Sequence, residues 1–345
     1  MKTAIILSLL LSVAAGSAFT QVTFSGTVYA GIQLQHTQDA DESITTTHRD
    51  GYPPRFDFTA TVMRENYGAR LDTRFQKTED PDGHFTLNGI YGWVDFLGNN
   101  ALRLTMGRIS SSAWVTRLHA RLPEYYFDKI TGFRVVYNTP IQGLSVGAAF
   151  RSDGHDAQSF AEQMIFGATF VHPRFSTVFA YDLGSNVRTL FGFNFTSIPG
   201  IPDLTAGIQL RAMHLASWDD DFFPGILDVH QVLGYRIMLG PQRPLNFYFI
   251  ASQTFHGTPD SDIGLEFTAG VESRILPNAL PNLSGSFGLT LESPDHFTTT
   301  NMTLNPMLEY TLQGPAIFYV EYVLRLDNMD TATHTFGFGI TIRAF

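Results

Sequence analysis

Cysteine is absent from all 345 residues of the chain, which excludes disulfides, thiolate metal sites and cysteine nucleophiles. Lysine is almost absent, because Lys2, Lys77 and Lys129 are the only three and arginine supplies nearly all of the positive charge. The formal net charge of −10 argues against nucleic-acid binding, which needs a basic surface. After residue 18 no apolar run approaches the roughly 20 residues of a transmembrane helix. Any membrane-spanning structure must therefore be a β-barrel.

Two sequence motifs of enzymes are also missing. The chain has no His-Glu-x-x-His zinc motif and no glycine-rich phosphate loop. Its 11 histidines are scattered through expected loops and strand ends. We therefore expect no enzymatic activity, no cofactor and no metal site.

Residues 1–18 have the features of a secretory signal peptide. Lys2 supplies the positive charge, an apolar core runs from Ala4 to Ala15, and small residues precede a cleavage point after Ala18. The core is too short for a membrane anchor, which is the alternative interpretation. We expect export through a cleaved signal and a single mature domain over residues 19–345.

Polar and apolar residues alternate along nearly the whole mature chain. Between 175 and 183 the odd positions form a largely apolar face, whereas Arg174, Ser176 and Asp182 lie on the other face. This period of two is typical of β-strands. A strand with ionised groups on one face and aromatic groups on the other separates two environments, which favours a barrel with lipid outside and water inside.

Turn signals divide the chain into strands. Short connections rich in Gly, Pro and Asn alternate with longer or more acidic ones such as Thr37 to Pro53. Counting between them gives about 18 strands; indistinct breaks at 184–186 and 328–330 make 16 the alternative. The prediction is an all-β, antiparallel, up-and-down transmembrane barrel with short periplasmic turns and longer extracellular loops. A soluble β-sandwich is the competing fold, but its core would have no place for faces that carry arginine.

The strand faces opposite the apolar ones are expected to line the lumen, and arginines outnumber carboxylates on them. The arginines are Arg70, Arg74, Arg103, Arg134, Arg151, Arg174, Arg188, Arg211, Arg236, Arg274, Arg325 and Arg343. The carboxylates are Asp57, Asp72, Asp182, Glu266, Glu272, Glu321 and Asp327. Fixed positive charge on a pore wall biases which ions stay in it. The alternative is that these arginines only solvate the lumen or pair with its carboxylates.

The connection over residues 110–129 is unusually apolar for a loop in water. It includes Trp114, Leu118 and Leu122, and it follows the fifth expected strand. Such a segment needs a surface to pack on, and we expect it to fold into the barrel and narrow the pore. An external lid and a contact with a neighbouring subunit are the alternatives.

This loop would bring acidic groups to the arginine wall. The strands near its root carry the closest arginines. The candidate constriction residues are Glu124, Asp128, Arg70, Arg74, Arg103 and Arg134.

Two short motifs give a resemblance to a known family. The segment Val22 to Gly31 resembles the first strand of the Gram-negative general porins, and Pro123-Glu124-Tyr125 resembles the Pro-Glu-aromatic tip of their constriction loop. The resemblance implies a water-filled, trimeric outer-membrane barrel, with loop carboxylates facing an arginine cluster. The chain departs from the family in three ways: Tyr126-Phe127 replaces a common Gly-Gly pair, Phe345 is out of phase with the last strand unless an irregularity near 343–344 restores it, and 18 strands exceed the usual 16.

The sequence therefore predicts a porin of the bacterial outer membrane, a passive diffusion channel for ions and small hydrophilic solutes. Outer-membrane lipids, these solutes and two further copies of the chain are the expected partners. The alternatives are a substrate-selective channel for sugars or anions and a non-transport surface barrel such as an adhesin.

Overall fold

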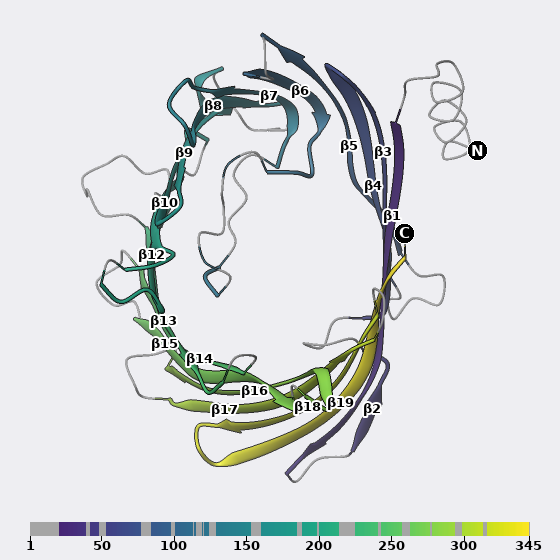
Figure 1. Cartoon of the computed structure of the whole chain (residues 1–345), viewed down its shortest axis with the longest axis vertical. Helices are drawn as coiled ribbons and strands as arrows, with labels where there is room; N and C mark the ends of the chain where they lie inside the picture. The colour runs from purple at the N-terminus through teal and green to yellow at the C-terminus, as the bar shows by residue number, and fades with distance from the viewer. Residues whose placement is uncertain are drawn as a thin grey trace.

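The computed structural model forms one antiparallel sheet that closes on itself (Figure 1). It describes residues 21–38, 42–47, 53–76, 84–97, 101–112, 114, 119, 121–123, 129–152, 160–184, 188–198, 200–213, 225–240, 243–256, 263–276, 278–293, 299–312 and 316–344. The candidates Glu124 and Asp128, the signal segment and Phe345 lie outside these residues. No described residue belongs to a helix long and apolar enough to cross a membrane.

The strands follow the alternating segments of the sequence. The first nine are β1 (Gln21–Thr37), β2 (Ser43–Thr45), β3 (Arg55–Arg64), β4 (Tyr67–Gln76), β5 (His84–Phe96), β6 (Leu102–Arg108), β7 (Thr131–Asn138), β8 (Leu144–Arg151) and β9 (Met164–His172). The others are β10 (Phe175–Asp182), β11 (Arg188–Phe195), β12 (Leu204–Met213), β13 (Ile226–Met238), β14 (Pro244–His256), β15 (Gly264–Leu276), β16 (Leu280–Ser293), β17 (Asn301–Thr311), β18 (Ala316–Asp327) and β19 (Thr331–Ala344).

The first and last strands close the barrel. β1 pairs with β19 from Gly26↔Ala344 to Thr37↔Thr333 and, on its other edge, with β3. The three-residue β2 pairs with the part of β1 that β3 leaves open, so it is an accessory strand in the long connection between them. The wall therefore contains 18 strands, and the larger of the two predicted strand numbers is confirmed.

Both indistinct breaks in the sequence separate strands, the first between the end of β10 at Asp182 and the start of β11 at Arg188. Between β18 and β19, Asn328 (φ 50°) and Met329 (φ 60°) both have positive φ, and the amide of Asp330 donates to the carbonyl of Asp327 over 3.0 Å. This is a type I′ turn without glycine, which explains why the sequence signal was weak. The described residues show no irregularity that would bring Phe345 into phase, because the β1–β19 register continues without a shift to Ala344.

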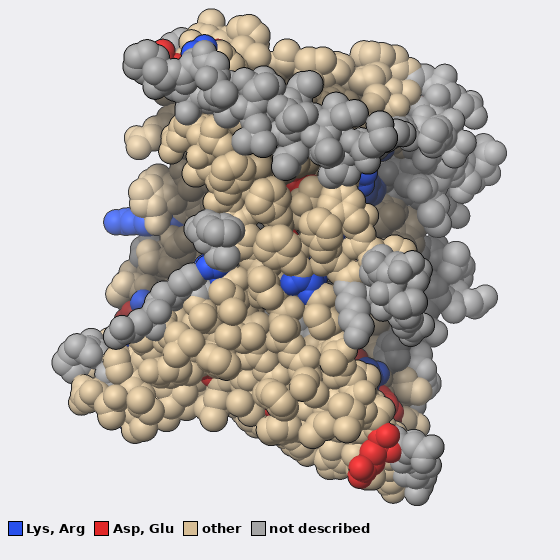
Figure 2. Space-filling model, turned by 90° about the vertical axis from the view of Figure 1, so that its right-hand side faces the viewer, with Lys and Arg blue, Asp and Glu red and all other residues tan. Residues whose placement is uncertain are grey.

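Burial in the barrel wall is inverted relative to a water-soluble protein. Large apolar side chains such as Phe179, Phe191 and Phe249 are exposed on the outer face, whereas Asp182 and Gln209 are buried on the inner face. Figure 2 shows few charged side chains across the middle of the outer surface near the β1–β19 seam. A wall that exposes apolar groups outward and turns charge inward is suited to lipid outside and water inside.

Candidate functional site

Part of the inner wall over β8 to β11 is apolar and carries a cluster of buried side chains. Its inward residues include Ile165, Val178 and Leu190, all at most 1% exposed. The side chain of Trp114, from the connection between β6 and β7, joins this cluster and is 2% exposed. Trp114, from the described part of the 110–129 loop, therefore packs on inward-facing apolar side chains of the barrel wall.

Glycines make room for the loop on this wall. A Cβ at Gly167 of β9 would lie 2.3 Å from the indole ring of Trp114, so only glycine permits the contact. Further along the loop, Leu122 is 1% exposed and its methyl group lies 3.3 Å from the Cβ position of Gly207 in β12. Described residues of the loop thus contact the inner wall at β9 and at β12.

Polar contacts continue the attachment to β12, β14 and β15. The amide of Gln209 donates to the carbonyl of Pro123 over 3.1 Å. The guanidinium of Arg121 donates to Glu272 over 2.5 Å, and its Cζ lies 3.5 Å from the ring centroid of Tyr248. An arginine that is stacked and ion-paired at once has little freedom to leave. These contacts hold the described loop residues against the far side of the lumen from the loop's root.

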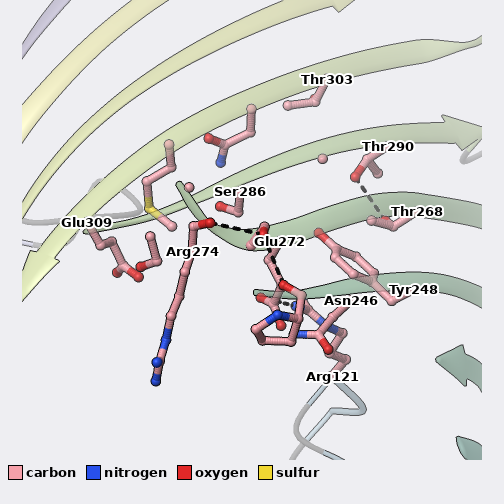
Figure 3. Close-up of a pocket in the computed structure, with 17 residues that line it drawn as sticks. Arg121, Asn246, Tyr248, Thr268, Glu272, Arg274, Ser286, Thr290, Thr303 and Glu309 are labelled. Atoms are coloured by element: carbon pink, nitrogen blue, oxygen red, sulfur yellow. Dashed lines mark hydrogen bonds and ion pairs between the residues drawn. The ribbon is translucent and has the colours of Figure 1, made fainter. Parts of the chain in front are cut away.

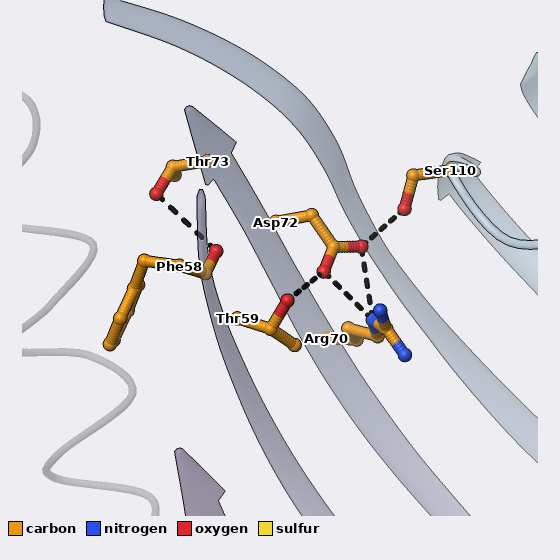
Figure 4. Close-up of polar contacts among 6 residues, drawn as sticks. All are labelled: Phe58, Thr59, Arg70, Asp72, Thr73 and Ser110. Carbon is orange, nitrogen blue, oxygen red and sulfur yellow. Dashed lines mark hydrogen bonds and ion pairs between the residues drawn. The ribbon is translucent and has the colours of Figure 1, made fainter. Parts of the chain in front are cut away.

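Asp72 of β4 is the centre of the polar cluster at that root (Figure 4). Its carboxylate accepts hydrogen bonds from Thr59 at 2.6 Å, from Nε of Arg70 at 2.9 Å and from the hydroxyl of Ser110. Ser110 begins the loop, so Asp72 attaches the loop to β3 and β4. These three donors fix the orientation of the Asp72 side chain.

The four predicted wall arginines lie on neighbouring strands at this root. Arg74 pairs with Asp57 at 2.7 Å, Arg103 pairs with Asp95 at 2.6 Å, and Arg134, 4% exposed, donates to the carbonyl of Ser111 at 2.7 Å. Two adjoining cavities of about 530 and 560 Å³ bring them together. Arg70 lines both cavities, Arg74 lines the first, and Arg103 and Arg134 line the second.

The first of these cavities has an excess of positive charge. Four basic residues line it, Arg70, Arg74, Arg108 and Lys129, against the two carboxylates Asp57 and Asp72. The structure thus brings the basic half of the predicted constriction together. The predicted acidic half, Glu124 and Asp128, lies outside the described residues.

Carboxylates on the wall are more numerous than the sequence analysis counted. Asp95, Asp228, Glu292 and Glu309 also stand at inward positions, opposite inward residues of the neighbouring strands. Asp95 was missed because the two residues before it on the inward face of β5, Tyr91 and Trp93, are aromatic. The sequence of β5 therefore shows no alternation of polar and apolar residues that would assign Asp95 to the lumen. The predicted surplus of arginine over carboxylate on the wall is therefore too large. Some described wall arginines outside the loop root also have acidic partners, as in Arg211–Asp228 and Arg188–Asp182.

A third cavity of about 520 Å³ lies on the opposite wall, over β14 to β17 (Figure 3). Its lining is rich in hydroxyl groups, and its charges balance: Arg121 and Arg274 against Glu272 and Glu309. The lumen therefore has a basic side and a neutral side, with the described loop residues along the wall between them. Among the described residues no group of three or more histidine, aspartate or glutamate side chains could hold a metal ion.

Solved structures with this fold come from the outer membranes of Gram-negative bacteria. OccK2 (OpdF) of Pseudomonas aeruginosa, in complex with glucuronate, has a TM-score of 0.64 at 11% identity, covering 94% of this chain and 98% of that chain. OccAB4 of Acinetobacter baumannii has a TM-score of 0.62 at 8% identity, with 95% and 99% covered. An anion-selective porin from Comamonas acidovorans has a TM-score of 0.52 at 11% identity, with 94% and 100% covered.

These identities establish the fold alone, and at that level the resemblance to Gram-negative porins is confirmed. No protein-family model and no curated protein sequence matches the chain.

Proposed function

We propose that the protein is an outer-membrane porin through which ions and small hydrophilic solutes diffuse passively. The observation that carries the proposal is the inverted polarity of a closed 18-stranded wall, with charged and amide side chains inside and aromatic side chains outside. A polar lumen of this kind holds water, and a water-filled lumen conducts.

The 110–129 loop is proposed as the constriction. Trp114 and Leu122 pack on the inner wall, and Arg121 is attached to Glu272 on the opposite side from the loop's root. A segment that lies on the inner wall reduces the open cross-section of the pore. In this proposal ions and solutes pass between the loop and the barrel wall, with Arg70 and Arg74 on the basic side of the passage.

A substrate-selective channel for small anions is the second candidate. The basic cavity over β3 to β7, where Arg70, Arg74, Arg108 and Lys129 meet two carboxylates, favours it. Two of the similar structures point the same way, since one contains glucuronate and another is described as anion-selective. Fixed arginine forks bind carboxylates well, so organic acids are the expected ligands of such a channel.

Planar-bilayer recordings of the purified protein test both candidates. Stepwise, ohmic currents that small carboxylates do not block support the general pore, and block at low carboxylate concentration supports the selective one. A variant lacking residues 115–118 removes apolar content from the loop and should conduct more than the parent. A correctly folded barrel that carries no current would exclude both channels and leave a surface barrel such as an adhesin.

Export and assembly complete the proposal. We expect residues 1–18 to be removed during export, the mature barrel to reside in the outer membrane, and three copies to associate as the porin resemblance implies. Mass spectrometry of the mature N-terminus and sedimentation in detergent measure the first and the last of these. No enzymatic role is proposed.

A further inference from the structure

The neutral cavity over β14 to β17 exists because two glycines face each other across the sheet. In the registers of the four strands, Tyr248 pairs with Gly270, Gly270 with Gly288, and Gly288 with Asn305. The two glycines carry no side chains, so the Tyr248 ring can occupy the space over Gly270, and the hollow lies beyond its hydroxyl, over Gly288 and toward Asn305 on β17.

Polar rows close the hollow along the strand direction. One row is Thr268, Thr290 and Thr303, whose first two hydroxyls lie 2.9 Å apart. The other row contains Glu272 and Ser286, four residues further along their strands, which is about 13 Å away. The cavity of about 520 Å³ is within the range of small-molecule sites.

The Tyr248 side chain forms one wall of the hollow, and its neighbours hold it in place. A Cβ at Gly270 would lie 2.2 Å from the Tyr248 hydroxyl, so the ring lies flat over this glycine. The Arg121 guanidinium covers the ring, 3.5 Å from its centroid. With Gly270 on one side and Arg121 over the ring, Tyr248 offers its hydroxyl rather than an open stacking surface. Figure 3 shows Tyr248 between Asn246 and Thr268, with Arg121 approaching from the loop.

The chemistry of the lining selects a class of solute. Seven of the lining residues bear hydroxyl groups, two are asparagines, and the four charged residues cancel. Hydroxyls and amides both donate and accept hydrogen bonds, as the hydroxyls of a sugar do. Ser286 and Thr303 make no side-chain hydrogen bond within the described part of the chain, and Oδ1 of Asn305 is an unmet acceptor there.

We propose that this hollow is a binding site for a neutral, polyhydroxylated solute of about monosaccharide size, separate from the basic side of the lumen. The inference rests on the proposed channel function, since the solute must enter through the lumen. Recognition uses hydrogen bonds to Ser286, Thr303 and Asn305 rather than ring stacking. Binding of this kind is weak enough for the solute to leave on either side of the membrane.

Glucose block of the ion current in planar bilayers tests the proposal. In the parent protein, glucose should lower the conductance saturably, in addition to its linear effect on solution viscosity. The double variant Ser286→Ala/Thr303→Val removes two hydroxyls that support no other side chain, and it should weaken the block by about fivefold for each hydroxyl. The matched control is Thr61→Val, which removes a hydroxyl from the basic side and should leave the block unchanged.

A second variant fills the hollow. A Cβ at Gly288 would meet only the Tyr248 hydroxyl at 3.4 Å, an ordinary contact, so Gly288→Leu should fold and abolish the block. Heat-dependent gel mobility verifies the folding of each variant. Equal block in the parent and the Ser286→Ala/Thr303→Val variant would overturn the proposal, as would a conducting parent that glucose does not block saturably. A folded parent without any current would instead reject the channel function itself.

Discussion

Asp182 illustrates how a single buried carboxylate can connect neighbouring strands of the barrel wall. It is 1% exposed and accepts hydrogen bonds from Arg151 at 2.9 Å, from Arg188, and from the amide of Gly184 at 3.0 Å. A charge so far removed from water is tolerated only when it is fully paired. The three donors come from β8, from β11 and from the turn after β10, so one side chain connects neighbouring parts of the barrel.

Replacing Asp182 with Asn should lower the free energy of unfolding by about 2–3 kcal/mol, because two guanidinium groups lose their counter-charge. Asp327→Asn is the matched control, since its pair with Arg325 is 45–53% exposed and worth less than about 1 kcal/mol. Urea unfolding in lipid vesicles, followed by tryptophan fluorescence, measures both. Equal losses in the two variants would show that burial does not decide the strength of these pairs.

His119 makes the loop sensitive to pH. Its Nδ1 accepts a hydrogen bond from the backbone amide of Arg121 over 3.2 Å, which requires an unprotonated nitrogen. Burial and then the positive charge of Arg121 hold the pKa of His119 below its ordinary value of 6.5. The undocked loop therefore binds a proton more readily than the docked loop. Docking is fully favoured above about pH 6.5 and weakens as the pH falls below that value.

We accordingly expect more frequent current fluctuations at pH 5 than at pH 7.5. The variant His119→Gln cannot titrate, and it should lose this dependence while still conducting. Single-channel recordings at both pH values provide the measurement. Fluctuations that rise equally in parent and variant would assign the effect to another group.

At the scale of elements, the loop depends on the strands it covers. Trp114 fits the inner wall because Gly147 and Gly167 stand beneath it on β8 and β9. Bulky residues at either position would push the indole into the lumen. Packing of this kind helps to hold the loop on the wall, since a buried tryptophan contributes several kcal/mol.

Gly167→Ala should displace Trp114, because the new methyl group would lie 2.3 Å from the ring. We expect a change in single-channel conductance and a red shift of the tryptophan emission. The control is Gly264→Ala on β15, where the nearest atom is 3.7 Å from the new Cβ. If both variants behave like the parent, the indole does not occupy this position.

The sequence predicted the strands well because alternation is a local signal, and it failed where contacts are not local. The number of strands followed from turn chemistry even though the Asn328-Met329 turn contains no glycine. The hollow over β14 to β17 could not be foreseen, because nothing in the order of residues shows that Gly270 stands opposite Gly288. Similarly, the apolar residues Val178 and Leu190 face inward, and only the loop that covers them explains why.

At the candidate site, the sequence predicted which arginines face the lumen but not which carboxylates they pair with. Arg70, Arg74, Arg103 and Arg134 were chosen from strand phase, and in the structure they line two cavities near the loop's root. Their partners come from adjacent strands, so the register decides them. Asp95 was missed because the inward face of its strand is aromatic before it becomes acidic.

At the scale of the whole molecule, the lumen is divided by charge. The side over β3 to β7 carries more guanidinium than carboxylate, and the side over β14 to β17 is balanced. The net charge of −10 must therefore be concentrated away from the basic side, in connections such as 219–221. Opposite fields at the mouth and along the wall compete for each ion.

Ion selectivity should consequently depend on salt. Charges more than about 8 Å apart are screened at physiological ionic strength, so wall groups dominate in concentrated salt and mouth acids contribute only in dilute salt. We expect weak anion preference or near-neutrality at high salt, drifting toward cations at low salt, in reversal potentials measured across a potassium chloride gradient. Arg108→Gln, in the basic cavity, should reduce the anion preference, whereas Arg243→Gln, at the short turn between β13 and β14, should not. Strong cation selectivity that persists at high salt would contradict this, because it would require an acidic group at the narrowest section to outweigh the arginines beside it.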